Sequence, residues 1–404
     1  MQMKLKEGLA MTKKTMSGER KQSLRKLAKL MNTRHRRPWP VTSPLLACFD
    51  VAVNQQEVDF LLRFGIEPHD YSEAEELSSQ SKDTFKAFFD KLIHKGFICK
   101  EHESGKEPEY LLAGIAFGWF EVIFADGKRT AEQKKLAVRG KELLESYQKF
   151  NIFPLRNLMN FKEKKLKPSQ SIIAFRDESK TRTATRLEVN QRLKTPEPAV
   201  YPSSKITDLL EEHAKDNSIA VIHCGCREMS NMAGNQCRFD FPTETCIAMG
   251  NFAKYMVDYG IGRYITKDEA LKIIETLRQK GAIHQIYHEE EDLSNSEFGF
   301  CNCCWDCCGV LGSYNRGIMP LNFKTFYLAQ IADESLCDGC GTCENYCPIQ
   351  AITVNNGKSQ IDLDKCIGCG QCEFQCPNDV ITLIAQEREV MLPLQKRSEA
   401  RIQA

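Results

Sequence analysis

Residues 337–377 read CDGCGTCENYCPIQAITVNNGKSQIDLDKCIGCGQCEFQCP. The pattern Cys-x-x-Cys-x-x-Cys-x-x-x-Cys-Pro occurs twice in this stretch, and the second copy begins 29 residues after the first. The text after each copy is also alike, since PIQAITV in one corresponds to PNDVITL in the other, and this indicates an internal duplication. The two copies hold eight of the nineteen cysteines of the chain: Cys337, Cys340, Cys343, Cys347, Cys366, Cys369, Cys372 and Cys376.

The cysteine spacing predicts how these thiols divide between two [4Fe–4S] clusters. Three thiolates at intervals of three residues wrap one loop around a cluster, and the fourth lies too far along to join them, so it ligates the other cluster. Structural zinc is the alternative for any single Cys-x-x-Cys pair, but two full tandem runs that end in Cys-Pro favour iron–sulfur. We therefore assign Cys337, Cys340, Cys343 and Cys376 to one cluster, and Cys366, Cys369, Cys372 and Cys347 to the other.

This stretch resembles a bacterial two-cluster ferredoxin from about residue 331 to residue 383. The apolar runs Ala351–Val354 and Val380–Leu383 predict short strands beside the cysteine loops. The resemblance implies a ferredoxin domain over residues 331–385, followed by a tail over residues 386–404. It also implies that the domain transfers single electrons.

Length and composition set the outer limits for the rest of the chain. At 404 residues there is room for two or three domains. The net charge of +1 argues against attraction of the whole protein to nucleic acid. A run of eighteen apolar residues and a signal peptide are both missing from the sequence, which predicts neither a membrane-spanning nor a secreted protein. Nineteen cysteines without an export signal indicate metal ligation in a reducing cytoplasm, as in an anaerobe.

The front of the chain is basic and then helical. Residues 1–44 are predicted to be a basic, partly disordered leader, because the first 40 residues hold twelve Lys and Arg against two Glu and the prolines at 38, 40 and 44 break any helix. The apolar stripe that includes Leu24 and Leu27 could lie on an anionic surface or belong to a solvated helix. Residues 45–160 form the next predicted domain.

Three predicted helices, Gln55–Phe64, Ser72–Leu77 and Lys82–Lys95, precede a predicted hairpin around a Glu-Ser-Gly-Lys turn. This order resembles a winged helix-turn-helix, which implies a third helix able to enter DNA. That helix offers lysines but no Arg, Asn or Gln to read bases. DNA binding is therefore disfavoured against a docking or structural role.

A second group of cysteines lies in residues 161–330, predicted to be a Cys-rich α/β domain. Cys224-Gly-Cys226-Arg227 follows a predicted buried strand, Ile219–His223. Thr266 and Glu269 form a capping box for a helix over Lys267–Lys280, and a strand over Ile283–His288 follows. The strands are expected to bring together nine thiols, those of Cys224, Cys226, Cys237, Cys246, Cys301, Cys303, Cys304, Cys307 and Cys308.

The nine thiols leave several metal sites open. Each half of the group could complete one [4Fe–4S] cluster, or one cluster could take ligands from both halves. The neighbouring pairs Cys303-Cys304 and Cys307-Cys308 cannot all meet one cluster, so some of them must point to a second cluster, to Zn²⁺, or serve as a redox dithiol. Arg227 could lower the pKa of the thiols beside it, and His223, His284 and His288 could act as further ligands.

Taken together, residues 50–385 are similar to a family of 4Fe–4S-binding proteins found in anaerobic bacteria and archaea. The similarity rests on Cys-x-Cys-Arg, the later Cys-x-Cys-Cys-x-x-Cys-Cys and the C-terminal ferredoxin pattern. It implies a multi-domain α+β fold and electron transfer, and it names no substrate.

The sequence therefore predicts an iron–sulfur electron-transfer protein or redox subunit, with two [4Fe–4S] clusters and one or two further clusters in the middle. Its expected partners are redox proteins. No glycine-rich nucleotide fingerprint, P-loop or His-Glu-x-x-His motif is present, and no catalytic residue is assigned. Two alternatives stay open: an iron–sulfur or thiol reductase that acts at the middle cysteines, and a redox- or iron-sensing winged-helix regulator.

Overall fold

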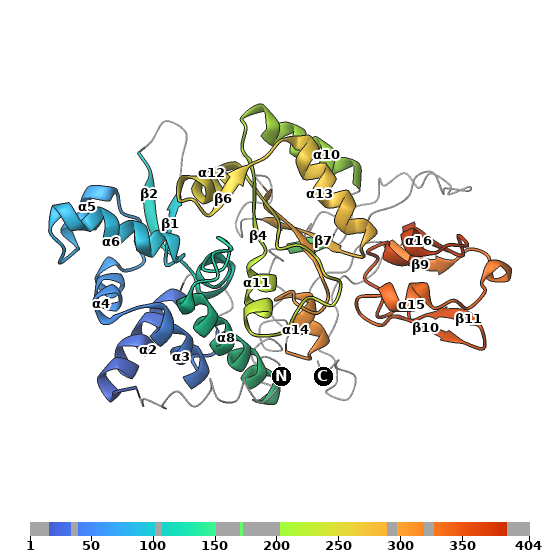
Figure 1. The fold of residues 1–404 in the computed structure, drawn as a ribbon, viewed down its shortest axis with the longest axis horizontal. Helices are drawn as coiled ribbons and strands as arrows, with labels where there is room; N and C mark the ends of the chain where they lie inside the picture. The colour runs from blue at the N-terminus through green and yellow to red at the C-terminus, as the bar shows by residue number, and fades with distance from the viewer. Residues whose placement is uncertain are drawn as a thin grey trace.

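Helices and strands follow one another along the chain in three parts (Figure 1). The computed structural model describes residues 16–33, 39–101, 107–150, 170–172, 203–288, 297–318 and 327–385. A helical N-terminal part, a central antiparallel sheet with helices, and a small C-terminal part of short strands together make an α+β protein. Within those ranges, every helix is too short or too polar to cross a membrane.

The N-terminal part has capped helices and one hairpin. Asn54 and Glu57 bond each other's backbone N–H at the start of α4, and Asp70 and Glu73 do the same for α5. The elements are α2 (Gly18–Asn32), α3 (Ser43–Ala52), α4 (Gln55–Phe64), α5 (Tyr71–Glu76), α6 (Lys82–His94), β1 (Ile98–Glu101), β2 (Glu109–Leu112), η2 (Ile115–Trp119), α7 (Phe120–Val122) and α8 (Ala131–Phe150).

Helix α2 differs from the predicted basic leader. Leu24, Leu27 and Met31 are fully buried, and the helix packs against α3 and α4. Arg20, on its polar face, donates from Nε to Asp50 Oδ1 of α3 at 2.9 Å. The reason is that an apolar stripe of period 3.6 specifies a core-facing helix even when the other face is strongly basic. Residues 1–15 and 34–38, also in the predicted leader, lie outside the described residues.

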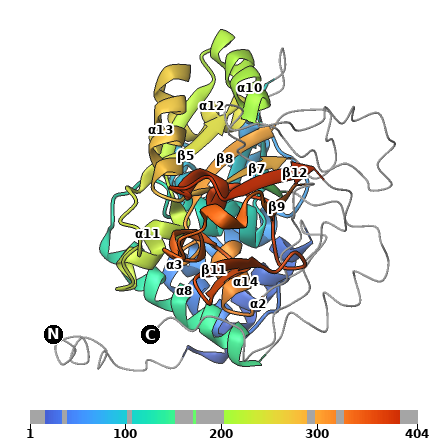
Figure 2. The ribbon, with the colours of Figure 1, turned by 90° about the vertical axis from the view of Figure 1, so that its right-hand side faces the viewer.

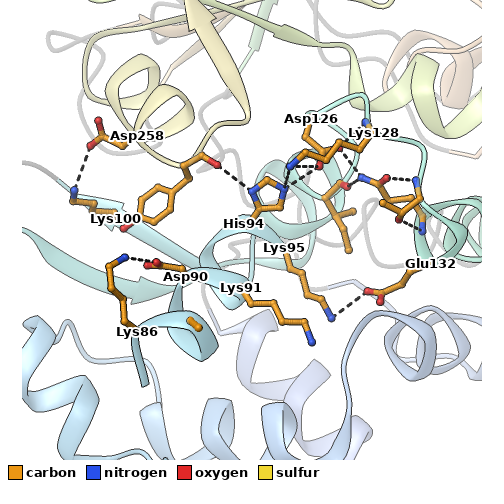
Figure 3. Close-up of a pocket in the computed structure, with 15 residues that line it drawn as sticks. Lys86, Asp90, Lys91, His94, Lys95, Lys100, Asp126, Lys128, Glu132 and Asp258 are labelled. Carbon is orange, nitrogen blue, oxygen red and sulfur yellow. Dashed lines mark hydrogen bonds and ion pairs between the residues drawn. The ribbon is translucent and has the colours of Figure 1, made fainter. Parts of the chain in front are cut away.

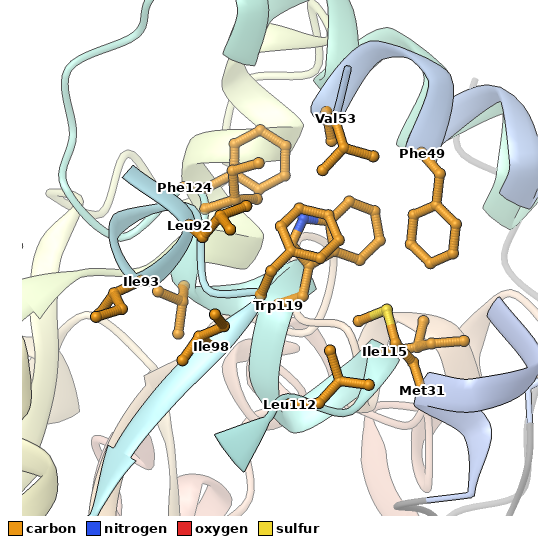
Figure 4. Packing of buried hydrophobic residues seen from close by; sticks show 14 of the residues in the cluster. Met31, Phe49, Val53, Leu92, Ile93, Ile98, Leu112, Ile115, Trp119 and Phe124 are labelled. Atoms are coloured by element: carbon orange, nitrogen blue, oxygen red, sulfur yellow. The ribbon is translucent and has the colours of Figure 1, made fainter. Parts of the chain in front are cut away.

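The core of the N-terminal part surrounds Trp119 (Figure 4). Its ring centroid lies 4.7 Å from that of Phe49 and 5.1 Å from that of Phe97. Trp119 ends the single π-helical turn η2, and α7 starts at the next residue. The indole therefore joins the long helices on one side of the core to the hairpin on the other.

Six strands form the central sheet in the order β3-β7-β8-β5-β4-β6, and all neighbours are antiparallel. Val221, Ile247 and Phe300 pack on one face against the helices α10 and α13, seen together above the sheet in Figure 2. The elements are β3 (Gln170–Ile172), α10 (Ser203–Lys215), β4 (Ile219–His223), α11 (Gly225–Met232), β5 (Glu244–Met249), α12 (Gly250–Asp258), β6 (Gly262–Tyr264), α13 (Lys267–Gln279), β7 (Ile283–His288), β8 (Glu297–Cys303) and α14 (Leu311–Asn315).

The C-terminal part repeats one small unit and docks on the central part. Gln371 Nε2 donates to the Ala282 carbonyl at 2.7 Å, and Arg278 lies over the Phe374 ring at 4.2 Å. Strand β9 pairs with β12, and β10 with β11. The elements are β9 (Tyr327–Ile331), η4 (Glu334–Leu336), α15 (Thr342–Tyr346), β10 (Ile352–Asn355), β11 (Lys358–Ile361), α16 (Gln371–Gln375) and β12 (Ile381–Ala385).

Trp119 gives a direct test of the N-terminal core. Replacing Trp119 by alanine removes a fully buried indole, so we expect the free energy of unfolding to fall by about 3–5 kcal/mol. Chemical denaturation followed by circular dichroism measures the change. The control Ile66→Ala, at a side chain that is 38% exposed, should change stability by about 0.5 kcal/mol or less. Equal effects of the two substitutions would contradict this account of the core.

Candidate functional site

Six of the nine middle thiols lie on the face of the sheet opposite α10 and α13. Side chains alternate between the two faces of a strand, so Cys301 and Cys303 of β8 point away from the helices that Phe300 contacts. Cys246 of β5 meets Cys301, with 3.8 Å between the two Sγ atoms. Contacts between thiols run on in one series through all members of this six-thiol group: Cys226, Cys224, Cys246, Cys301, Cys303 and Cys308.

Backbone amides surround the ends of the six-thiol group. Gly309 N lies 3.3 Å from Cys226 Sγ, and the N–H groups of Val310 and Leu311 donate to Cys308 Sγ at 3.3 and 3.4 Å. Hydrogen bonds from Cys226 and Cys246 lower the pKa of Cys224 well below its ordinary value, against the effect of burial. Hydrogen bonds to neighbouring thiols, together with burial, raise the pKa of the other five members, so the metal-binding thiolate form is favoured at Cys224.

Gly225 brings the N-terminal part against this group. A Cβ atom on Gly225 would lie 2.4 Å from the carbonyl oxygen of Glu121, which is closer than any real Cβ contact. The missing side chain lets the backbone between Cys224 and Cys226 pass directly over α7. The two thiols are therefore positioned by the N-terminal part as well as by the sheet.

The other three middle thiols gather at a separate point together with a carboxylate. One ligand atom each from Cys237, Cys304, Asp306 and Cys307 all lie within 4.8 Å of one another, and all four residues are buried. We call these residues the four-ligand group. Hydrogen bonds from Cys304 and Cys307 lower the pKa of Cys237 to about 2, against the effect of burial. The sequence analysis missed Asp306, although it stands inside the Cys-Cys-Trp-Asp-Cys-Cys run.

The structure thus divides the nine predicted thiols by geometry and not by their order in the chain. Cys237 lies with Cys304 and Cys307 and not with the cysteines nearest to it in sequence, while Cys303 and Cys308 lie in the six-thiol group. In each of the pairs Cys303-Cys304 and Cys307-Cys308, which flank Trp305, one cysteine therefore belongs to the six-thiol group and the other to the four-ligand group.

Arg227 lies between the two groups. It is fully buried, and its guanidinium donates to Thr245 Oγ1 and to the Asn302 carbonyl, each at 2.9 Å, and stacks 5.1 Å above the Phe241 ring. Burial lowers its pKa, but thiols of both groups raise the pKa above the ordinary value of an arginine. Among the described residues no carboxylate forms an ion pair with Arg227, and the charges that raise its pKa are those of thiols.

Seven of the eight C-terminal cysteines lie in two sets, one of four thiols and one of three. Cys372 lies in the field of Cys369, Cys347 and Cys366, and these four thiols line one cavity. In the other set, Ser359 Oγ lies 3.1 Å from Cys343 Sγ and 3.6 Å from Cys337 Sγ, and Cys376 is the other thiol whose charge acts on Cys343. Cys340 is exposed. Four thiols among apolar side chains are the ligand set of a [4Fe–4S] cluster.

Asn315 joins the C-terminal part to the middle cysteines. Its Nδ2 donates to the Pro348 carbonyl at 2.8 Å and to the Trp305 carbonyl at 3.1 Å. Pro348 follows Cys347, and Trp305 stands between the two neighbouring-cysteine pairs. Cys303 and Cys308 also share one buried apolar cluster with thiols of the C-terminal part, so apolar packing among the described residues connects the two sites.

The histidines considered as ligands have other partners. His223 Nδ1 lies 2.9 Å from Thr243 Oγ1 and 3.4 Å from Glu228 Oε1. His284 Nδ1 lies 2.7 Å from Asn302 Oδ1, and burial lowers the pKa of His284 to about 3. The side chain of His288 lies outside the described residues. The structure brings neither His223 nor His284 into the two middle groups.

A large open cavity at the third helix bears on the regulator hypothesis (Figure 3). Its lysines face carboxylates of the same chain: Lys86 pairs with Asp90, and Lys100 Nζ lies 3.3 Å from Asp258 Oδ2. Lys95 is only 11% exposed and contacts Glu57 and Glu132. Figure 3 shows the same pairing at Asp126, which contacts His94 and Lys128. Because these lysines already form ion pairs with carboxylates of the same chain, this surface gives little support to DNA binding.

Comparisons with known proteins find one family. Residues 329–377 match the 4Fe-4S dicluster domain, which makes this a 4Fe–4S-binding protein and supports an electron-transfer role. Neither a curated protein nor a solved structure matches the chain.

Glu228 fixes the helix that carries Cys226 and Arg227, and it gives a pH test. Burial raises its pKa, but hydrogen bonds from His223 and Arg129 outweigh burial and hold the pKa at about 2. A carboxylate whose pKa is lowered in the folded state stabilises the fold fully at pH values above its pKa in the unfolded chain, 4.5. This stabilisation is lost as the pH falls toward the folded-state pKa of about 2. We expect Glu228→Gln to be less stable than wild type at pH 7, with the difference in urea midpoints shrinking from pH 5 to pH 3.

The matched control is Glu142→Gln, because Glu142 is 42% exposed and pairs with Arg139 at the surface. It should change the urea midpoint little at either pH. A Glu228→Gln difference that stays constant with pH would contradict the buried ion pair between Glu228 and Arg129.

Proposed function

We propose that this chain is an electron-transfer protein or redox subunit in which residues 331–385 hold two [4Fe–4S] clusters and the six-thiol group holds further iron–sulfur. The proposed domains are residues 45–160, 161–330 and 331–385, with a redox protein of the cytoplasm as partner. The proposed ligands in the C-terminal domain are Cys337, Cys340, Cys343 and Cys376 for one cluster, and Cys366, Cys369, Cys372 and Cys347 for the other.

The shared cavity of Cys347 with thiols of the second copy supports the crossed ligand sets, and the two copies have equivalent hydrogen bonds at their fourth cysteine. Ala351 N donates to Cys347 Sγ at 3.1 Å, and 29 residues later Val380 N donates to Cys376 Sγ at 3.4 Å. Each of these thiols is the fourth cysteine of its own copy. The amides stabilise thiolate charge at the positions that cross to the other set, and such donors raise the reduction potential of a cluster.

Spacing supports a cluster in the six-thiol group. Each thiol contacts its neighbours in the series, yet within the described ranges no three of these six atoms belong to a set that lies mutually within 4.8 Å. A single ion would need its ligands that close. Six thiols in one series are also more than one tetrahedral ion can bind. Cys246 Sγ and Cys301 Sγ, now 3.8 Å apart, would move apart to bind different irons of one cluster.

The observation that carries the proposal is the contact at Asn315 between the C-terminal part and the loop of the middle cysteines. When bound, an iron–sulfur cluster takes up and releases one electron at a time. Asn315 holds the loop after Cys347 against the loop around Trp305, and buried apolar side chains such as Val310 and Leu311 exclude water between the thiol sites. A partner would approach at Cys340, which is exposed. The chain thus supplies one continuous path from its surface to the six-thiol group.

The proposal predicts a defined loss of iron in the double variant Cys303→Ser/Cys308→Ser. We expect wild type to contain more than the roughly eight iron atoms of two [4Fe–4S] clusters, and the variant to keep those eight and lose the rest. Iron and sulfide analysis under anaerobic conditions, with EPR of the dithionite-reduced protein, measures both. The electrons taken up per chain in a reductive titration should fall in step.

The control for this experiment is Cys99→Ser, because Cys99 is half-buried in β1 and lies outside all the thiol groups. It should leave iron, sulfide and electron uptake unchanged. If the double variant also behaves like wild type, the six-thiol group holds no iron–sulfur and the proposed path ends in the C-terminal domain.

A further inference from the structure

We propose that the four-ligand group of Cys237, Cys304, Asp306 and Cys307 is a closed site for one zinc ion, separate from the iron–sulfur sites. Its ligands would be three thiolates and one carboxylate. This inference does not depend on the proposed electron transfer, because a zinc ion has no redox chemistry.

The distances fit a single ion and not a cluster. Zinc binds thiolate at about 2.3 Å in a tetrahedral site, which puts two ligand sulfurs about 3.8 Å apart. All four ligand atoms here lie within 4.8 Å of one another, so one ion reaches them with small adjustments. Among the described residues this is the one set of three or more such ligands whose atoms all lie within 4.8 Å of one another. The cysteines of the 4Fe-4S dicluster domain form no such set, so the spacing separates the two kinds of site within one molecule.

Asp306 is oriented for ligation by the backbone. Its Oδ2 accepts from Arg238 N and its Oδ1 accepts from Cys307 N, each at 2.8 Å. Ligating carboxylates in metal sites are held by such second hydrogen bonds. One amide belongs to Arg238, the residue after Cys237, and the other to the proposed ligand Cys307, so the carboxylate joins the two ligand-bearing loops. Each oxygen keeps a lone pair for an ion.

The surroundings fit the charge of the site. Three thiolates, one carboxylate and a divalent ion leave a net charge of about −2 in a buried place. Arg227 approaches from one side, with the charges of Cys304 and Cys237 acting on it. Arg238 lies 5.1 Å above the Trp305 ring, which shields the opposite side together with Phe239. An open cavity that Cys237 lines gives the ion a route in.

The site would fix the direction of the neighbouring cysteines. Cys304 and Cys307 are each adjacent in sequence to a member of the six-thiol group, Cys303 and Cys308. Holding the inner pair on zinc makes the outer pair face the other way. A metal that cannot change its oxidation state is suited to this positioning role, because the loop keeps its shape when electrons arrive nearby.

Wild-type protein tests the site without any substitution. We expect about one zinc per chain by mass spectrometry of protein purified anaerobically in the presence of zinc. X-ray absorption at the zinc edge should give about three sulfur neighbours at about 2.3 Å and one oxygen at about 2.0 Å. Absence of zinc, a mononuclear iron signal in EPR, or a shell of four sulfurs would each overturn the assignment.

Variants place the ion at these residues. Cys307→Ser should lose the zinc, and Asp306→Asn should bind it roughly 10–100-fold more weakly in competition with a chelator. The matched control is Cys226→Ser in the six-thiol group, which should lower the iron content and keep one zinc. Full zinc content in both Cys307→Ser and Asp306→Asn, or loss of zinc in Cys226→Ser instead, would show that the ion lies elsewhere.

Discussion

The buried Arg227 guanidinium is the interaction on which the middle of this protein depends. Four thiols act on its charge: Cys224 and Cys246 of the six-thiol group, and Cys237 and Cys304 of the four-ligand group. A buried charge without a counter-charge costs several kcal/mol, and no carboxylate among the described residues pairs with Arg227. The arginine and the thiols therefore stabilise one another: any thiolate charge beside Arg227 supplies its counter-charge, and the arginine lowers the cost of burying the two thiol groups side by side.

The antiparallel sheet makes this arrangement possible by separating two kinds of surface. Val221, Ile247 and Phe300 bury one face under α10 and α13, and the alternating positions of the same strands bear Cys246 and Cys301. One register therefore specifies both the apolar core and the thiol positions. A slip of one residue would exchange them, so the hydrophobic packing of the helices fixes the positions of the thiols.

Local signals predicted the elements well, and the grouping of ligands poorly. The predicted strands Ile219–His223 and Ile283–His288 are β4 and β7, and the helix capped at Thr266 is α13, because alternation and capping depend on neighbouring residues. The partners of Cys237 lie on a loop that it meets only in the folded chain, because Cys237 and Cys304 are 67 residues apart in sequence. Asp306 escaped notice because a single carboxylate among cysteines carries no periodic signal.

The loop around Trp305 explains why the neighbouring cysteines are useful and not redundant. Successive side chains of an extended or turning loop point in different directions, so Cys303 and Cys304 cannot serve the same site, and the same holds for Cys307 and Cys308. The outer members face the six-thiol group and the inner members face Asp306. One short loop thus belongs to two sites, and Asn315 ties it to a third, at Pro348. A shift of this loop would alter all three sites together, which makes its rigidity the condition for keeping them at fixed separation.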